Sequence, residues 1–384
     1  MQQSNFVKKL DFFYFEAGGG HRAAAQALHQ VIESQGRAWD VQLVNLQELL
    51  LELDVARKWF NIHMEDIYNL LLKKGWTLGM AQMKKVLVAV VRFYHRAEVR
   101  ELSRHFAARR PDLVVSLIPN FNRALYEALV KTCPSSAYVT ILTDFADFPP
   151  HFWIEPDQRQ YFICGTELAV SQAKAMGHDS SRISLVSGMI LNPRFYEPVM
   201  VDRAAERARL GLRADLPTAL VLFGGEGSPA MLRIARLLNQ ARLPMQAVYI
   251  CGRNATLAQR LKSMTHAMPV RIEGFTREIP RFMALSDFFI GKPGPGSISE
   301  AVAMRLPVIV DRNAWTMPQE RYNADWVIEN DLGLVVKSFN QIADAVRKIL
   351  EPATLARFQS NAAARQNRAV FEIPDVLERI LSHG

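Results

Sequence analysis

A loop punctuated by glycine and proline, running directly from an apolar strand into a helix, is the feature that most constrains the fold of this chain. The strand covers 288–290, and the loop and helix read Gly-Lys-Pro-Gly-Pro-Gly-Ser-Ile-Ser-Glu-Ala over 291–301. Gly294 and Gly296 allow the backbone to approach a phosphate closely, and the free N–H groups at the helix start, expected near Ser297, point at its charge. This segment therefore predicts an anion site at the carboxyl end of a strand.

Glu300 lies one turn into the same helix. A carboxylate there would repel a phosphate, but it can accept hydrogen bonds from a sugar diol, as acidic residues do on riboses in dinucleotide sites. A nucleotide or nucleotide sugar is thus the first ligand to test. The alternative interpretation is that Ser297 caps the helix and Glu300 completes a capping box.

A second glycine cluster in the same half of the chain follows the apolar strand 218–223. It reads Phe-Gly-Gly-Glu-Gly-Ser over 223–228. Two phosphate-capable loops in one half are expected to converge on one ligand. The candidate contacts in this second loop are Gly224, Gly225, Glu226 and Gly227.

A third glycine cluster, near the N-terminus, ends in a histidine. Glu-Ala-Gly-Gly-Gly-His-Arg spans 16–22 and places His21 at the start of an alanine-rich helix. The helix dipole disfavours a protonated imidazole there and keeps it available as a base, although a lone histidine is often structural. Asp144 and His151 are rival bases, because both lie on the loop after the strand 138–142, where α/β sheets present ligand-binding loops. The alternative interpretation is that this loop is only a proline-rich surface segment.

Short apolar strands alternate with helical segments throughout, which is typical of parallel α/β sheets covered on both faces. The expected strands are 11–15, 41–46, 113–117, 138–142, 161–164 and 183–186 in the first half, and 219–223, 246–251, 269–272, 287–290, 307–310 and 334–336 in the second.

The length of 384 residues exceeds what one typical core accommodates. The segment 187–201 lacks periodicity and contains glycine and prolines, so it predicts a hinge. The predicted organisation is an N-terminal domain over 1–187, a hinge over 188–201, a C-terminal domain over 202–370 and a terminal helix over 371–384.

Several classes of protein are not indicated by the composition. The three cysteines are scattered without a CxxC pair, which argues against a disulfide framework or a zinc site and favours a reducing cytoplasm. Neither a D-x-D pair nor an HExxH motif occurs, so no catalytic metal is expected. The N-terminal segment reads as a strand and not as a signal peptide, and no apolar run approaches the roughly 18 to 20 residues of a spanning helix.

The positive charge is concentrated in one stretch. From Arg57 to Arg110 there are twelve Lys or Arg and four Asp or Glu, an excess equal to the net charge of +8 of the whole protein. Trp59, Trp76 and Phe93 are interleaved with these charges, as in a helix lying in an anionic membrane interface. The alternative is a solvated helical face packed on its domain. A nucleic-acid surface is not expected, because no recognisable nucleic-acid module accompanies the stretch.

Seven strings, in order, resemble the GT-B glycosyltransferases, in particular the family of diacylglycerol galactosyl- and glucosyltransferases related to the peptidoglycan N-acetylglucosaminyltransferase. They are GGGHRAAA at 18–25, TDFADFPPHFW at 143–153, FGGEG at 223–227, CGRN at 251–254, GFTREIPRFM at 274–283, GKPGPGSISEA at 291–301 and PQERYNA at 318–324. The resemblance spans nearly the whole chain. It implies an α/β fold of GT-B architecture, with two Rossmann-like domains, parallel sheets, an interdomain cleft and a last helix that braces the N-terminal domain.

Together with the missing metal motifs and the basic stretch, the resemblance implies an inverting, metal-independent transfer of a hexose from a UDP-sugar to a lipid, with no bound cofactor. Diacylglycerol is the first acceptor to expect, and the enzyme would be peripheral on the cytoplasmic face of the cell membrane. The resemblance further implies that the backbone around Phe275 and Thr276 faces the uracil and Glu300 the ribose. Arg253 is either a positive charge for the diphosphate or a surface arginine. Gln319, Glu320 and Asn323 match the segment that holds the transferred sugar, although Met317-Pro318 stands where relatives usually have Pro-Gly.

Other functions remain open at this point. One is transfer from a UDP-sugar to a polyprenyl-linked or non-lipid acceptor. Another is non-catalytic nucleotide-sugar binding, which would need Glu300 but not His21. A UDP-sugar epimerase is disfavoured by the basic stretch, and a dinucleotide oxidoreductase by the lack of G-x-G-x-x-G in the first βα unit. The motifs specify neither the UDP-hexose nor the oligomeric state.

Overall fold

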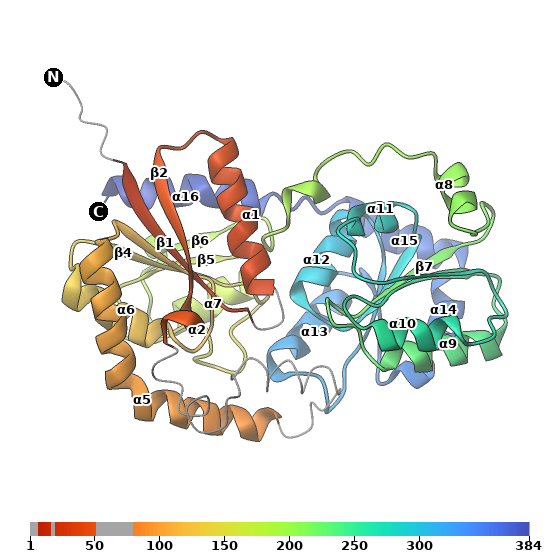
Figure 1. The fold of residues 1–384 in the computed structure, drawn as a ribbon, viewed down its shortest axis with the longest axis horizontal. Helices are drawn as coiled ribbons and strands as arrows, with labels where there is room; N and C mark the ends of the chain where they lie inside the picture. Colours follow the sequence, from red (N-terminus) through yellow and green to blue (C-terminus); the bar gives the residue numbers. More distant parts are fainter. Residues whose placement is uncertain (1–6, 17–19, 51–79, 384) are drawn as a thin grey trace. The chain divides into compact units, whose positions relative to one another are not determined.

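The computed structural model describes residues 7–16, 20–50 and 80–383, which fall into two compact units (Figure 1). Unit 1 takes the described residues up to Pro193 and those from Asn367 onward, and unit 2 takes Arg194–Gln366. The chain thus passes from unit 1 to unit 2 between residues 193 and 194, and returns to unit 1 between residues 366 and 367. For these two crossings, the sequence predicts a hinge over 188–201 and a terminal helix that begins at 371.

Unit 1 is built around a six-stranded parallel sheet of order β2-β1-β3-β4-β5-β6. Its strands are β1 Lys8–Tyr14, β2 Trp39–Asn45, β3 Leu113–Ser116, β4 Ala137–Ile141, β5 Tyr161–Cys164 and β6 Ile183–Leu185. Its helices are α1 Gly20–Ser34, α2 Leu46–Leu49, α5 Met80–Arg109, α6 Asn122–Thr132, α7 Glu167–Ala175, the 3-10 turn η2 Ser180–Arg182, and α16 Ala369–His383. The chain leaves β1 for β2 on one side and returns to β3 on the other, so the strand order reverses between β1 and β3.

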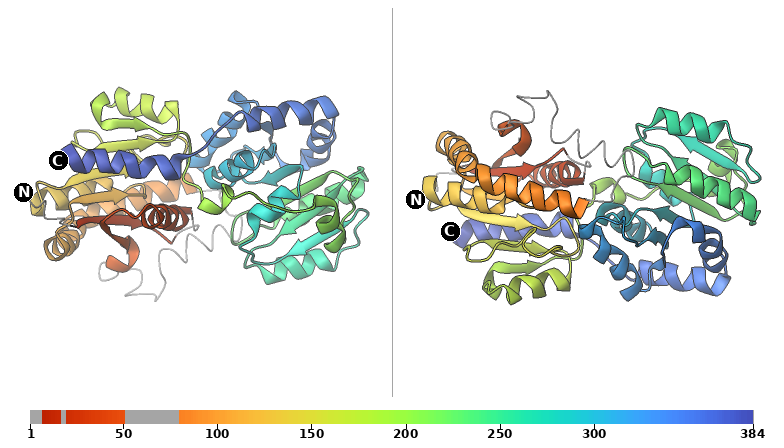
Figure 2. Two further views of the ribbon diagram at one scale, coloured as in Figure 1. Left: turned by 90° about the horizontal axis from the view of Figure 1, so that it is seen from above. Right: turned by 90° about the horizontal axis from the view of Figure 1, so that it is seen from below.

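The C-terminal helix α16 belongs to unit 1, where it packs on α1 and lies along the sheet in both views of Figure 2. Arg37 forms ion pairs with Asp375 and Glu378 of this helix. The backbone N–H of Ser187 donates to Glu372 Oε2 at 2.8 Å. These contacts tie the last segment of the chain to the domain that contains its first strand.

Unit 2 contains the second six-stranded parallel sheet, of order β12-β11-β10-β7-β8-β9. Its strands are β7 Thr218–Leu222, β8 Gln246–Ile250, β9 Val270–Glu273, β10 Phe288–Gly291, β11 Val308–Asp311 and β12 Gly333–Val336. Its helices are α8 Arg203–Arg209, α9 Ala230–Ala241, α10 Ala255–Lys262, α11 Ile279–Ala284, α12 Pro295–Ala303, α13 Arg321–Glu329, α14 Ile342–Ile349 and α15 Pro352–Ala363, with 3-10 turns η4 Pro318–Glu320 and η5 Phe339–Gln341. The 3-10 turn η3 Pro193–Phe195 spans the boundary between the two units. Here the order reverses between β7 and β10.

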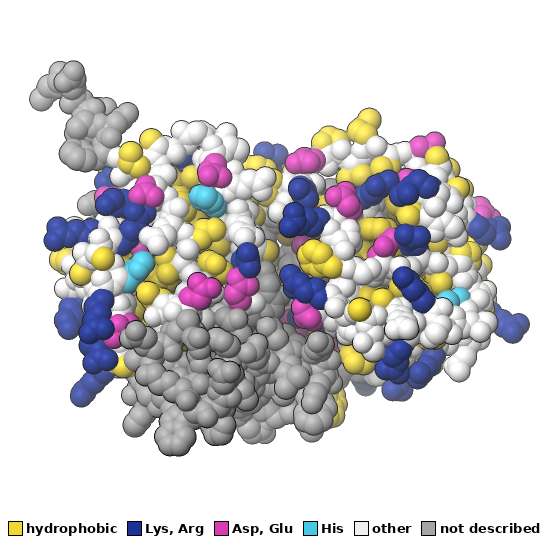
Figure 3. Space-filling model, in the orientation of Figure 1, with side chains coloured by type: hydrophobic (Ala, Val, Ile, Leu, Met, Phe, Trp, Pro, Cys, Tyr) yellow, Lys and Arg dark blue, Asp and Glu magenta, His cyan; other side chains and the backbone are white. Residues whose placement is uncertain are grey.

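Basic residues are distributed over much of the described surface. On the face drawn in Figure 3, Lys and Arg side chains are spread over both units and do not gather in a single patch. Of the helices that the structure describes, none combines the length and the apolar character needed to cross a membrane.

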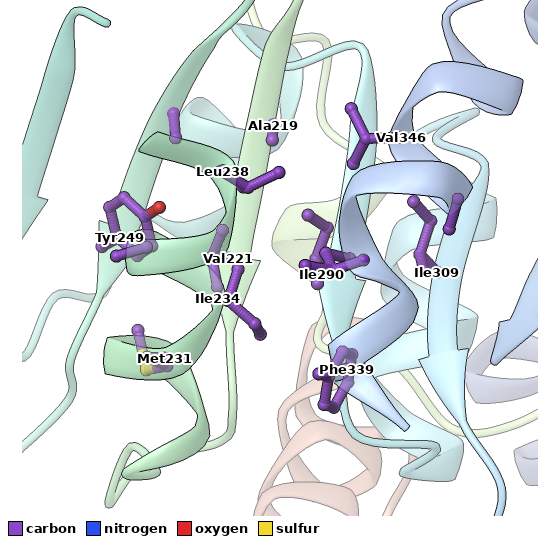
Figure 4. Packing of buried hydrophobic residues seen from close by; sticks show 14 of the residues in the cluster. Ala219, Val221, Met231, Ile234, Leu238, Tyr249, Ile290, Ile309, Phe339 and Val346 are labelled. Carbon is purple, nitrogen blue, oxygen red and sulfur yellow. The ribbon is translucent and has the colours of Figure 1, made fainter. Parts of the chain in front are cut away.

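The core of unit 2 explains why its strands read as continuous apolar runs. Every residue of β7, β8 and β10 is buried. Figure 4 shows Val221, Ile290 and Ile309 of adjacent strands facing the helices α9 and α14. Helix α9 contributes Ile234 and Leu238, four positions apart on one face. Parallel strands covered on both faces need this pattern.

All twelve strands expected from the sequence occur in the described part, each within three residues of its expected ends. The expected start of α12 was wrong. The helix begins at Pro295 and not near Ser297, and its N-cap is Gly294, which makes no side-chain cap hydrogen bond. Proline at the first helical position has its φ preset for the helix and lacks an N–H that would need a cap. The capping-box alternative for Ser297 and Glu300 is therefore excluded.

Candidate active-site residues

In unit 1 the carboxyl ends of three neighbouring strands meet at His21. This residue is the second of α1, which follows β1. Its Nδ1 lies 3.1 Å from the hydroxyl of Thr143, just after β4, and the ring hydrogen-bonds the backbone of Leu117, just after β3. The point where the strand order reverses is where α/β sheets bind ligands, so His21 occupies the expected place for chemistry in this unit.

The surroundings of His21 keep its imidazole neutral. The ring is half-buried, with its centroid 6.0 Å from the ring of Trp153 and 6.5 Å from that of Phe15. Burial lowers its pKa from 6.5 to about 4, while the hydrogen bond to Leu117 acts in the opposite direction. A neutral imidazole at pH 7 can accept a proton from a hydroxyl group, which is the property that a general base needs.

The two rival bases are placed differently. Asp144 is buried, and its Oδ2 accepts a 2.9 Å hydrogen bond from the indole N–H of Trp153. The ring of Trp153 also lies beside that of His21, so His21 and Asp144 both neighbour the same indole. The side chain of His151 is exposed, and its backbone has a left-handed φ of 64°.

In unit 2 the loop after β7 lies at the point where the strand order reverses. Gly224 and Gly227 have φ of 73° and 62°, conformations that L side chains rarely adopt. A Cβ on Gly227 would also stand 2.7 Å from the carbonyl oxygen of Cys251. Gly225 is exposed and Glu226 half-buried. The backbone of this loop is therefore shaped by glycine and accessible at the carboxyl edge of the sheet.

Arg253 connects this loop with two others. Its backbone N–H donates to the carbonyl of Gly225 at 2.8 Å, and its Nη1 lies 3.2 Å from Glu226 Oε1. Its guanidinium stands 4.9 Å from the ring centroid of Phe275, on the loop after β9. Thr276, next in the chain, accepts a hydrogen bond from the N–H of Glu278. The loops after β7, β8 and β9 are thus held together around one guanidinium.

The start of α12 is the other anion site that the sequence predicts in unit 2. Gly296 is exposed, with open space where a Cβ would stand, and Ser297 is half-buried. Glu300 is half-buried one turn further on, and burial raises its pKa to about 7. The helix N-terminus and the carboxylate therefore lie on consecutive turns, as a phosphate and a ribose in one ligand require.

The segment predicted to hold the transferred sugar is tied to the loop after β10. Glu320 is buried, and its Oε1 accepts from Lys292 Nζ at 2.7 Å. Asn323 is fully buried; its Nδ2 donates to the carbonyl of Pro293 at 2.8 Å, and among the described residues its Oδ1 has no hydrogen-bond partner. Gln319 points its amide at the sulfur of Met317. The unusual Met317-Pro318 pair is accommodated, because Pro318 opens the turn η4.

Two families and a set of relatives match the sequence. Residues 21–188 match the family described as Monogalactosyldiacylglycerol (MGDG) synthase, and residues 219–380 match the Glycosyltransferase family 28 C-terminal domain. A probable monogalactosyldiacylglycerol synthase of Nicotiana tabacum is 30% identical over 387 residues, covering 97% of this chain and 70% of the relative. A probable monogalactosyldiacylglycerol synthase 2 of Oryza sativa subsp. japonica is 30% identical, covering 96% and 79%. The chain belongs to the monogalactosyldiacylglycerol synthase family.

Membership of the monogalactosyldiacylglycerol synthase family confirms the resemblance inferred from the seven strings and makes the protein a glycosyltransferase. Solved structures confirm the fold class. Acinetobacter baumannii MurG matches with a TM-score of 0.61 and 12% identity, over 97% of this chain and 99% of MurG. S. aureus MnaA, solved with UDP, matches with a TM-score of 0.62 and 15% identity, over 98% and 97%.

In this member of the monogalactosyldiacylglycerol synthase family, sequence reasoning missed a residue that shapes the loop after β4, on which both rival bases lie. Asp147 is fully buried, and its carboxylate accepts from the backbone N–H groups of His151, Phe152 and Trp153 at 2.9, 2.9 and 2.6 Å. Burial raises the pKa of Asp147, against the effect of these hydrogen bonds. An aspartate before a Pro-Pro turn is a signal for side-chain capping of the following backbone, and could have identified it.

Sequence reasoning also left Thr143 and Lys292 without roles, although both stand inside quoted motifs. Thr143 contacts the candidate base, and Lys292 holds Glu320. Asp311, the last residue of β11, is a further titratable group at the carboxyl edge of the unit 2 sheet. Burial raises its pKa to about 6. Over the part of the chain that the structure describes, no group of three or more His, Cys, Asp or Glu could hold a metal ion.

Proposed function

We propose that this protein transfers a hexose, galactose in the first instance, from a UDP-sugar to diacylglycerol, with inversion at the anomeric carbon and without a metal ion. The observation that carries the proposal is the match to relatives named monogalactosyldiacylglycerol synthases over 97% of the chain. The position of His21 after β1, with Nδ1 3.1 Å from the Thr143 hydroxyl at the carboxyl edge of the sheet, supports a catalytic role over non-catalytic nucleotide-sugar binding, because a binding protein has no need of a base there.

The chemistry proposed for unit 1 is proton abstraction. As the acceptor hydroxyl attacks the anomeric carbon, the new C–O bond forms while the bond from that carbon to the diphosphate oxygen breaks. The hydroxyl proton passes to His21, which later releases it to solvent, and UDP departs with the bonding electron pair. One displacement by one nucleophile inverts the configuration. The Thr143 hydroxyl, 3.1 Å from Nδ1, would fix the ring during this transfer.

The chemistry proposed for unit 2 is charge stabilisation on the departing diphosphate. Backbone N–H groups of the loop 224–227 and of the start of α12 are fixed dipoles, and Arg253 adds a full positive charge. These groups can supply the stabilisation for which other transferases use a divalent cation. Glu300 would accept hydrogen bonds from the ribose, and Gln319 and Glu320 from hydroxyls of the sugar.

The test is an assay of the full chain with radiolabelled UDP-galactose, UDP-glucose and UDP-N-acetylglucosamine, each offered with diacylglycerol vesicles and with a total lipid extract. We expect a labelled product with diacylglycerol, a β-linkage by NMR from the α-linked donor, and undiminished activity in excess EDTA. A labelled product that forms only in the lipid extract would assign a different acceptor. Retention of configuration, or strict dependence on added Mg²⁺ or Mn²⁺, would contradict the mechanism.

A further inference from the structure

Glu226 is a carboxylate placed inside a loop that the proposed function assigns to a diphosphate. It lies between Gly225 and Gly227, at the point where the strand order of unit 2 reverses. Like charges repel, so an acidic side chain in such a loop weakens the binding of the anion unless it has another task. The carboxylate is engaged with Arg253, whose Nη1 lies 3.2 Å from Glu226 Oε1.

The close approach of two loops brings Arg253 and Glu226 together. Gly252 carries no Cβ, and one placed there would lie 2.0 Å from the carbonyl oxygen of Gly225. The loops after β7 and β8 can therefore approach, and the N–H of Arg253 donates to that carbonyl at 2.8 Å. The ring of Phe275 lies against the guanidinium, with 4.9 Å between its centroid and Cζ. Backbone and ring hold Arg253 beside Glu226 whether or not the ion pair is formed.

The ion pair is accessible and weak. The side chains of Arg253 and Glu226 are 65% and 36% exposed. Exposed ion pairs contribute little to stability, since water screens both charges. A diphosphate carries more negative charge than one carboxylate and can replace it on the guanidinium, which presents five N–H donors. When the diphosphate leaves, the carboxylate is already beside the vacated donors.

We propose that Glu226 is a built-in competitor of the diphosphate for Arg253, which limits the affinity for UDP and so promotes release of that product. The inference rests on the proposed function and deepens it: Glu226 is a positioning residue that acts through Arg253. Arg253 alternates between two anionic partners, the carboxylate in the free protein and the diphosphate in the complex.

Calorimetry on the full chain tests this, with UDP and uridine as probes. In E226Q the competing charge is gone while the side-chain shape is kept, so UDP should bind about two- to fivefold tighter, the range that an exposed ion pair allows. Uridine, which has no phosphate, should bind equally to E226Q and wild type. In the R253Q background, E226Q should give no gain. The matched control is D215N, which removes one carboxylate from an exposed Arg pair that precedes β7, at the opposite edge of the sheet.

The contrary results are distinct. Weaker UDP binding by E226Q would show that Glu226 orients Arg253 for the phosphate instead of competing with it. An equal gain for E226Q in the wild-type and R253Q backgrounds, or in D215N, would reduce the effect to general charge repulsion. Each of these results would overturn the inference about Glu226, but the protein would still bind nucleotide and the proposed function would stand. If wild type binds neither UDP nor uridine, the proposed function fails, and this inference with it.

Discussion

His21 is kept neutral by its nonpolar surroundings and not by a charged partner. Its pKa of about 4 predicts that the acid limb of the pH profile of kcat/KM lies near pH 4, whereas an unperturbed histidine would place it near 6.5.

His21→Ala should lower kcat by about 10² to 10⁴ and leave UDP affinity unchanged, because the base belongs to the acceptor side of the reaction. Normal activity in His21→Ala, with large losses in Asp144→Asn or His151→Ala, would reassign the base.

The same shift in pKa predicts a dependence of stability on pH. Between about pH 4 and 6.5 the unfolded chain binds a proton at His21 that the folded protein does not. The free energy of unfolding should therefore rise with pH across this window. Urea titrations of wild type and His21→Asn should diverge there, with the flatter profile in the variant.

Glu300 is poised to titrate near neutrality. Burial raises its pKa to about 7, and hydrogen bonds from ribose hydroxyls would favour the charged form. Affinity for uridine should therefore increase as pH rises through 7, and Glu300→Ala should weaken binding by about 1–3 kcal/mol. Uridine is the better probe, because the terminal phosphate of UDP itself titrates near pH 6. Glu300→Gln should lose the pH dependence; if it keeps the dependence, another group is responsible.

At the scale of one element, Asp147 organises the segment from Ala146 to Trp153. Its carboxylate accepts hydrogen bonds from three consecutive backbone N–H groups, the last of which belongs to Trp153. These bonds fix the position of Trp153, which contacts both His21 and Asp144. In Asp147→Asn one of these donors faces an amide N–H₂ group and loses its acceptor. We expect a loss of about 1–3 kcal/mol in the free energy of unfolding, with a decrease in kcat and unchanged uridine affinity. Asp157→Asn, at an exposed position shortly beyond the loop, is the matched control. Full activity in Asp147→Asn would separate the loop from catalysis.

The elements were more predictable from sequence than the contacts between them. Strands that are buried on both faces leave continuous apolar runs, so β7 and β10 could be located within one residue. Glycine-rich turns after them mark the carboxyl edge for the same local reason. The roles of Asp147 and Lys292 could not be derived in this way, because each depends on a hydrogen bond whose partner is fixed only when loops fold against each other. The start of α12 was missed because Pro295 and Ser297 carry competing signals for the first turn.

At the scale of the whole molecule, the basic stretch from Arg57 to Arg110 remains a prediction, because most of its side chains lie outside the described residues. Within the described part of α5, Arg109 is paired with Asp11 and Asp40, and Arg104 with Glu101. These arginines are already paired within the fold. Membrane attraction should therefore come from the earlier lysines of the stretch.

We propose that this stretch places the enzyme on the cytoplasmic face of an anionic membrane, where a lipid acceptor is available. Replacing Lys73, Lys74, Lys84 and Lys85 by Ser should weaken binding to anionic vesicles by at most about 4 kcal/mol, from about 1 kcal/mol per charge near the surface. Binding should also weaken with salt, since ions screen the attraction. The matched control replaces four exposed lysines elsewhere, Lys174, Lys262, Lys337 and Lys348, by Ser.

Co-sedimentation with vesicles of graded anionic lipid content measures the effect, and turnover on vesicles is compared with turnover on detergent-dispersed diacylglycerol. The first quadruple variant should lose vesicle binding and vesicle turnover while keeping detergent turnover, because its chemistry is intact and only access to the acceptor is impaired. The control should keep all three, since its lysines lie outside the stretch whose interleaved Trp59, Trp76 and Phe93 are proposed to enter the interface. If wild type fails to sediment with anionic vesicles at low salt, or if the two quadruple variants behave alike, the stretch is a solvated face of its domain and the acceptor reaches the enzyme by another surface.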